Sequence, residues 1–224
     1  MSIQIIGSSA ATIAEVDGTT YRAVRVTSRP ADYGLVGQYK VSAVSGALAT
    51  LATGSLYTFQ WSDPIVVAVV WGIAIDVNSS TSQTGAIFFQ AKASLVRSFT
   101  TSASNGTLLT LPGAPPTNQQ LRTSMHSTRV QEIRIANTAV VTDGTWVLDA
   151  NPFGCRTFSI QDTSLGIVGN VVANNLLFGQ LERRGACFVL AKNEGFTIKA
   201  STSATLNASL NIGVTTAWSE VAIY

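Results

Sequence analysis

The sequence predicts an all-β protein, an antiparallel sandwich or barrel, from three observations. Apolar residues alternate with small or polar ones over residues 206–214, which is the period of a strand buried on one face. The same alternation runs over residues 196–200, and the small polar residues 201–205 between the two runs predict an antiparallel hairpin. Short runs of this kind recur along the chain without a convincing helix longer than two turns, which is typical of sandwiches and barrels.

Each further strand is predicted from a short apolar or alternating run bounded by Gly, Pro, Asn or Asp. A turn at Asp143–Gly144 is expected to pair residues 129–137 with 144–149. Residues 45–55 fit either a helical turn or a surface strand. The other strands are expected at 20–27, 38–44, 57–61, 65–77, 87–91, 94–99, 176–181, 186–191 and 218–224, with shorter pieces within 158–172.

The predicted domain organisation is an N-terminal arm, residues 1–18, followed by a single β-sandwich domain, residues 19–224. Residues 100–120 are a candidate internal linker, because they contain Gly106, Gly113 and the pair Pro115–Pro116. We expect this segment to cross the top of one domain, because neither side of it has a complete set of strands.

Residues 65–77 are the most apolar stretch of the sequence. One face of a strand here would carry bulky side chains and the other small apolar ones, so both faces should be covered. Either a second layer of the same chain covers the small face, or a neighbouring subunit does. For the second alternative, the candidate interface residues are Val66, Ala68 and Val70, together with Ile3, Ile5 and Ile6 of the arm.

The composition favours association with other proteins. Only 12% of residues are charged and 46% are hydrophobic, so few charges would have to be desolvated when the surface is buried against another subunit. A net charge of +2 without a basic cluster argues against nucleic acid as a partner. Residues 65–75, the longest apolar run, are too short for a membrane-spanning helix of about 20 residues. The first residues lack the pattern of a secretory signal, so we expect reduced, buried Cys155 and Cys187, with a disulfide between them as the alternative.

No motif in the sequence predicts catalysis, and we expect no catalytic residue, metal or cofactor. The single histidine, His126, is not part of a sequence motif that would supply a nucleophile and a carboxylate to orient the imidazole. The acidic residues are mostly beside turns, where capping is their expected role, although two distant carboxylates could meet as in glycosidases. Core packing is the expected role of the aromatic residues, with a sugar-binding surface as the alternative: Tyr57, Phe59, Trp61, Trp71, Trp146 and Trp218.

Four segments resemble a group of uncharacterised tailed-bacteriophage proteins: residues 32–39, 121–125, 132–136 and 190–200. The resemblance implies a virion structural protein encoded with the structural genes. It implies no particular functional residue in this sequence. We therefore expect a jelly-roll-like capsid decoration (cement) protein on the virion surface, assembled in the host cytoplasm. Its expected partners are its own copies, as a cyclic homo-oligomer and first of all a trimer, and the major capsid protein or other virion proteins. The alternatives are a receptor- or carbohydrate-binding tail fibre or spike domain and a polysaccharide-degrading enzyme.

Overall fold

The computed structural model describes residues 35–51, 54–79, 87–111, 127–160, 176–179, 187–201 and 204–222. All of them belong to the compact unit Gly34–Tyr224. Several predictions lie outside the described residues: the N-terminal arm with Ile3, Ile5 and Ile6, the strand at 20–27, His126, and residues 112–120 of the candidate linker.

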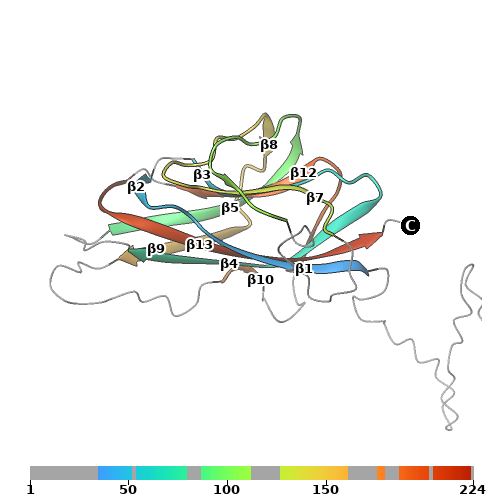
Figure 1. The fold of residues 1–224 in the computed structure, drawn as a ribbon, viewed down its shortest axis with the longest axis horizontal. Coiled ribbons are helices and arrows are strands. Elements are labelled where there is room, and N and C mark those ends of the chain that lie inside the picture. The colour runs from blue at the N-terminus through green and yellow to red at the C-terminus, as the bar shows by residue number, and fades with distance from the viewer. Residues whose placement is uncertain are drawn as a thin grey trace, which may run out of the picture. The chain divides into compact units, whose positions relative to one another are not determined.

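The described residues form two antiparallel β-sheets packed face to face, with no helix among them (Figure 1). Sheet one contains β1 (Leu35–Val44), β2 (Leu48–Leu51), β4 (Val66–Ser79), β10 (Leu176–Gly179), β11 (Phe188–Leu190) and β13 (Ala204–Ala222). Sheet two contains β3 (Ser55–Trp61), β5 (Ile87–Phe99), β6 (Thr107–Leu108), β7 (Val130–Ile135), β8 (Trp146–Leu148), β9 (Gly154–Ile160) and β12 (Glu194–Ala200). The ambiguous segment 45–55 thus contains a strand, β2.

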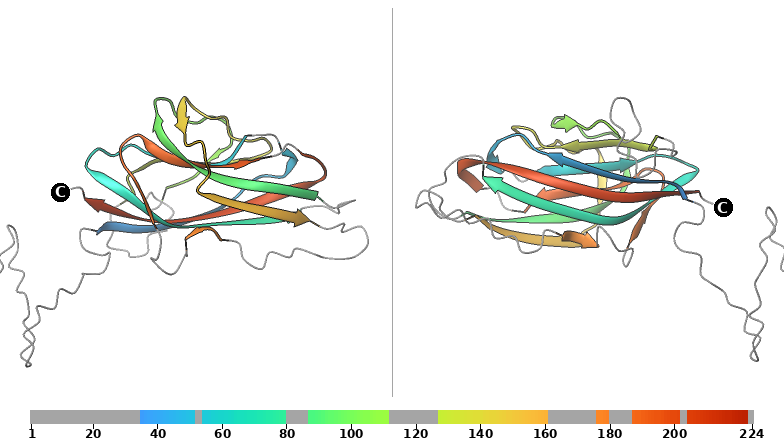
Figure 2. Two further views of the ribbon diagram at one scale, coloured as in Figure 1. Left: turned by 180° about the vertical axis from the view of Figure 1, so that it is seen from behind. Right: turned by 60° about the horizontal axis from the view of Figure 1, so that its bottom comes forward.

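The strand order confirms the predicted jelly-roll-like sandwich. Eight strands form the framework: β1, β3, β4, β5, β9, β10, β12 and β13. We number these eight strands one to eight in chain order. The neighbouring strands in sheet one are then strands one, eight, three and six, and those in sheet two are strands two, seven, four and five. The two ends of this framework are therefore neighbours in sheet one, and most connections cross between the sheets, as in a jelly roll. The right view of Figure 2 brings forward sheet one, where β1, β13 and β4 run side by side.

Two predicted strand pairings are wrong, although the strands themselves are present. Strands β12 and β13 do not form a hairpin, because β12 pairs with β3 and β5 in sheet two while β13 pairs with β1, β2 and β4 in sheet one. Likewise β7 pairs with β3 and β6, whereas β8 pairs with β5. Alternation reports which face of a strand is buried, but it does not report the partner strand.

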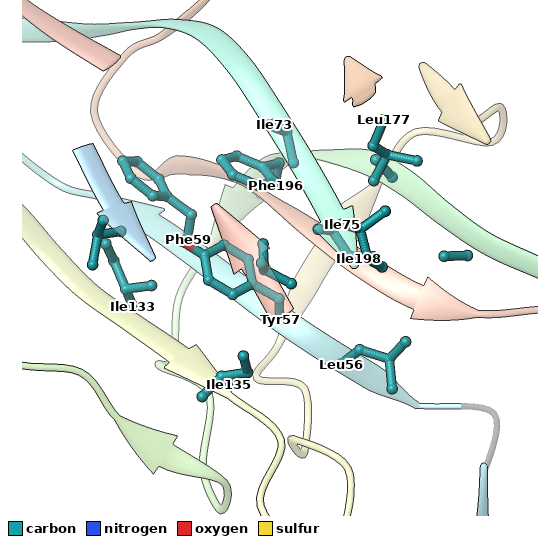
Figure 3. Close-up of a cluster of buried hydrophobic side chains, with 14 of the residues drawn as sticks. Leu56, Tyr57, Phe59, Ile73, Ile75, Ile133, Ile135, Leu177, Phe196 and Ile198 are labelled. Atoms are coloured by element: carbon teal, nitrogen blue, oxygen red, sulfur yellow. The ribbon is translucent and has the colours of Figure 1, made fainter. Parts of the chain in front are cut away.

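Aromatic and branched aliphatic side chains from both sheets fill the space between them (Figure 3). Trp218 of β13 stacks on Tyr39 of β1 with ring centroids 5.5 Å apart, and meets Phe59 of β3 edge-on at 5.2 Å. Phe59 in turn stacks on Phe196 of β12 at 5.2 Å. These contacts join strands that are far apart in sequence, so the aromatic side chains hold the two sheets together.

Described loops of the connection between β5 and β9, residues 100–106 and 136–145, cover part of the outer face of sheet two. Thr58 and Gln60 alternate with the core-facing Tyr57 and Phe59, yet they are also buried. The amide of Ala103, in the connection, donates a 3.0 Å hydrogen bond to Oε1 of Glu132 on β7. Residues 100–106 of the candidate linker are thus part of this covering layer, whereas β6, which follows them, extends sheet two by pairing with β7.

Candidate interaction surface

A β-bulge at Trp71 decides which side chains of β4 face the core. Opposite β13, Gly72 pairs with Ala217 and Val70 pairs with Trp218, so Trp71 is an extra residue in β4. Before the bulge the even-numbered residues point inward, and after it the odd-numbered residues Ile73 and Ile75 do. The extra residue therefore turns the inward face of β4 over within one strand.

The bulge places the predicted interface residues of β4 inside the chain. Val66 is 3% exposed, and Ala68 and Val70 are 0% exposed, all within the core between the two sheets. Of the two explanations for the small face, the structure therefore shows burial by a second layer of the same chain. In an isolated copy these three side chains are not available to a neighbour.

The outer face of sheet one carries an apolar patch instead, which we call the valine patch: Ile65, Val67, Val69, Val189 and Val221. Ile65 is 63% and Val189 54% exposed, and the three other side chains are half-buried. Cross-strand pairing brings Val189 of β11 next to Val69 and Val221 of β13 next to Val67. Four valines from three strands thus lie together, with Ile65 just before β4, and no charged side chain is among them.

The opposite end of the same face is polar. Asp76 and Asn78 of β4 are exposed there. A 2.9 Å hydrogen bond joins the hydroxyl groups of Ser42 and Thr215 across β1 and β13. The apolar character of this face is thus concentrated around the strand ends at residues 65–69 and 221, which is the arrangement expected of a contact surface with a polar rim.

A buried polar cluster fixes the β5–β9 connection onto sheet two. Asp143 accepts hydrogen bonds from the Ser55 hydroxyl and the Lys199 ammonium. Ser55 Oγ also lies 2.7 Å from the Thr197 hydroxyl, which donates to the Tyr57 carbonyl oxygen at 3.2 Å. Ser55 is fully buried, so its hydroxyl is in no position to reach a substrate, and the cluster holds the covering layer in place.

A second set of polar contacts lies nearby in the same layer. The side-chain amide of Gln60 is oriented with its nitrogen toward Glu132. The Gln60 nitrogen donates to Glu132 Oε1 at 2.9 Å, and the Gln60 oxygen accepts a hydrogen bond from Trp146 Nε1 at 3.1 Å. Arg134 Nε donates to Glu132 Oε2 at 3.3 Å. The buried Glu132 carboxylate therefore has partners for both oxygens, as a structural ion pair requires.

The aromatic side chains considered for a sugar-binding surface are mostly in the interior. Tyr57, Phe59, Trp61 and Trp218 are 0% exposed and Trp71 is 8% exposed. Trp146 is half-buried, and its indole nitrogen donates a 3.1 Å hydrogen bond to the Thr101 carbonyl oxygen. These aromatic residues therefore present no stacking platform of exposed rings for a sugar.

Asp63 and Asp149 take part in a turn and an ion pair, the kind of role that the sequence predicted for acidic residues beside turns. Burial opposes the ionisation of Asp63, but hydrogen bonds from the amides of Ile65 and Val66 and from Arg129 outweigh it and lower the pKa of Asp63. Exposed Arg97 forms a two-bond pair with Asp149, both at 2.7 Å, which lowers the pKa of Asp149. Within the part of the chain that the structure describes, no three His, Cys, Asp or Glu side chains are grouped as a metal site would require.

The two cysteines are free thiols, and both are exposed. The expected absence of a bridge thus agrees with the structure, whereas the expected burial is wrong. Cys155 is on β9 and Cys187 directly precedes β11.

Among the described residues there is no helix of a length and hydrophobicity suited to crossing a bilayer.

Comparisons with known proteins give little further information. No protein-family model matches the chain, and no curated protein matches its sequence. Among solved structures, a mutant of the unassembled VP1 pentamer of Washington University polyomavirus aligns with 83% of this chain and 96% of its own. The sequence identity is 10% and the TM-score 0.25, a level of similarity that carries no argument about function.

Proposed function

We propose that this chain is a structural subunit of a virus particle, a capsid decoration protein that packs against copies of itself and against the shell. The proposal starts from the resemblance of residues 32–39, 121–125, 132–136 and 190–200 to tailed-phage virion proteins. The jelly roll is compatible with it, but this fold also serves lectins and enzymes, so the fold alone does not decide. The observation that supports it best is the valine patch.

The occupant that we assign to the valine patch is a second copy of the chain. Burial of exposed apolar side chains under a partner lowers the free energy of the system and so favours association. A net charge of +2, with 12% charged residues, leaves little electrostatic repulsion between identical copies. A closed ring of copies, with a trimer as the first expectation, would repeat this contact and present several copies to the shell at once.

The oligomeric state of the full chain tests this proposal. Size-exclusion chromatography with light scattering should show an oligomer for the unmodified protein and a smaller species for Val189→Lys, since lysine brings a charge that must be desolvated in the contact. The matched control is Val44→Lys. Val44 is 67% exposed on the same sheet, but it lies across Gly213 from Asp76, at the polar end. Val44→Lys should leave the oligomer intact.

A monomeric unmodified protein, or equal effects of the two lysine variants, would contradict the assignment of the valine patch. The role in the particle is tested separately by a cryo-electron microscopy map of the phage particle that carries the chain. Density for this sandwich on the outer shell supports a decoration protein, whereas density at the tail tip would support the receptor-binding alternative.

A further inference from the structure

Glu220 of β13 is a carboxylate in the interior of the sandwich. Glu220 is 0% exposed. Its side chain lies on the core face of sheet one, between the cross-strand neighbours Gly37 of β1 and Ala68 of β4. Trp218, two residues earlier on the same face, is also 0% exposed. A carboxylate in such surroundings is expected only where partners compensate for its lost hydration.

Among the described residues, only one of its two carboxylate oxygens has such partners. Oε1 accepts hydrogen bonds from the Thr128 hydroxyl at 2.5 Å and from the Arg129 amide at 2.8 Å. Within the part of the chain that the structure describes, Oε2 is buried without a hydrogen-bond partner of normal geometry, and so is the indole nitrogen of Trp218, which lies close to the carboxyl group. The Arg129 guanidinium is turned to Asp63, with Nη1 3.1 Å from Oδ2, and the Arg129 side chain is 42% exposed. The ionised carboxylate is thus half-satisfied in an apolar environment.

We propose that Glu220 is a proton-binding residue of the folded sandwich, which makes the protein more stable just above a pH of about 4.3, where unfolded glutamate ionises, than at neutral pH. When protonated, Oε1 can still accept the two hydrogen bonds from residues 128 and 129, and Oε2 no longer carries an unhydrated charge. Because residues 128 and 129 lead into β7 of sheet two, the same carboxyl group joins the two sheets in both protonation states.

The electrostatic environment agrees with this geometry. Burial raises the pKa of Glu220, and the opposing effects of Thr128, the Arg129 amide, the nearby Trp218 indole and the Arg129 charge are smaller. The titratable group that faces it from β1 is Tyr39, whose pKa is raised by burial and by the charge of Glu220, so that Tyr39 stays neutral. From β4, the facing residue is Ala68, which does not titrate.

The sign of the pH dependence follows from this shift. An unfolded glutamate has a pKa of about 4.3. Between that value and the raised pKa of Glu220, the folded state binds a proton that the unfolded state does not. The equilibrium constant for unfolding therefore increases as the pH rises through this window, by at most about tenfold per pH unit for one proton. Below the window the stabilisation is complete, and above it the stabilisation is absent.

Urea unfolding of the full chain from about pH 4.5, just above the pKa of an unfolded glutamate, to about pH 8 tests the proposal. Every protein carries His126→Gln, so that the only histidine of the sequence does not titrate. The background protein should lose stability as the pH rises, and Glu220→Gln should remove this slope while retaining an oxygen acceptor for residues 128 and 129. Thr128→Val deletes a hydrogen bond that favours the ionised carboxylate, so it should move the slope to higher pH.

The Thr128→Val shift is a result that a purely structural glutamate would not produce, and it keeps the test decisive if Glu220→Gln does not fold. Asp149→Asn is the matched control, because Asp149 is in an exposed ion pair and its pKa is lowered. This variant should leave the slope between about pH 4.5 and about pH 8 unchanged, because Asp149 is ionised throughout this range. The proposal is wrong if the background protein is equally stable across this range, or if Glu220→Gln keeps the full slope.

Discussion

Isosteric threonine substitutions at two adjacent residues of β4 test the bulge and the orientation of the valine patch together. Val70 is 0% exposed in the core, whereas its neighbour Val69 is half-buried on the outer face beside Val189. Threonine preserves shape and strand propensity, so the two variants differ mainly in where the new hydroxyl group lies. The comparison therefore reports the direction of each side chain.

At Val70 the hydroxyl would be buried between the sheets without a partner, which costs about 1 to 3 kcal/mol of stability in protein mutational data. For a chain of this size that corresponds to a decrease in Tm of about 2 to 12 °C. At Val69 the hydroxyl reaches solvent, and the expected change is within about 0.5 kcal/mol.

Differential scanning calorimetry at several protein concentrations measures both effects, because association through the valine patch would add concentration-dependent stability. At the lowest concentration, Val70→Thr should unfold well below the unmodified protein and Val69→Thr close to it. Equal losses, or a larger loss for Val69→Thr, would show that β4 has no face reversal at Trp71.

Two further substitution and labelling experiments follow from the backbone packing and the thiols. A Cβ atom on Gly195 would lie 2.3 Å from the Phe59 carbonyl oxygen, so Gly195→Ala should lower the urea midpoint by an amount equivalent to about 1 to 3 kcal/mol. At Gly213 the nearest contact would be 3.6 Å, so Gly213→Ala should be neutral or stabilising by up to about 1 kcal/mol; a loss as large as that of Gly195→Ala would contradict the packing. A thiol-specific reagent should label both Cys155 and Cys187 in the folded protein, and protection of either until denaturant is added would contradict their exposure.

Most strands could be predicted from the sequence, because the alternation of apolar and polar residues is a local property. The alternating residues 206–214 lie within β13, and residues 196–200 within β12. Their pairing could not be predicted in the same way. The small polar residues 201–205 predict a hairpin loop, but β12 and β13 belong to different sheets, and each strand pairs with segments far away in sequence.

The candidate surface shows the same limit. Residues 65–77 were correctly expected to be covered on their small apolar face, yet the valine patch includes Val67 and Val69, which pattern alone assigned to the face of Ile73 and Ile75. A strict period of two cannot reveal one extra residue in a run that is apolar on both faces, because either register buries hydrophobic side chains. A strand is predicted at residues 186–191, but the pattern does not indicate that its Val189 is 54% exposed.

The sequence by itself determined the class of this protein: all-β, poor in charge, with apolar runs of strand length. Only the tertiary structure decided which strands are neighbours, which side of β4 is outside, and that the acidic side chain of Glu220 points into the core. The physical reason is that composition and alternation act on each segment separately. Strand order, a bulge and the burial of one carboxylate are instead selected by the free energy of the whole packed sandwich, through contacts between residues that are distant in the chain.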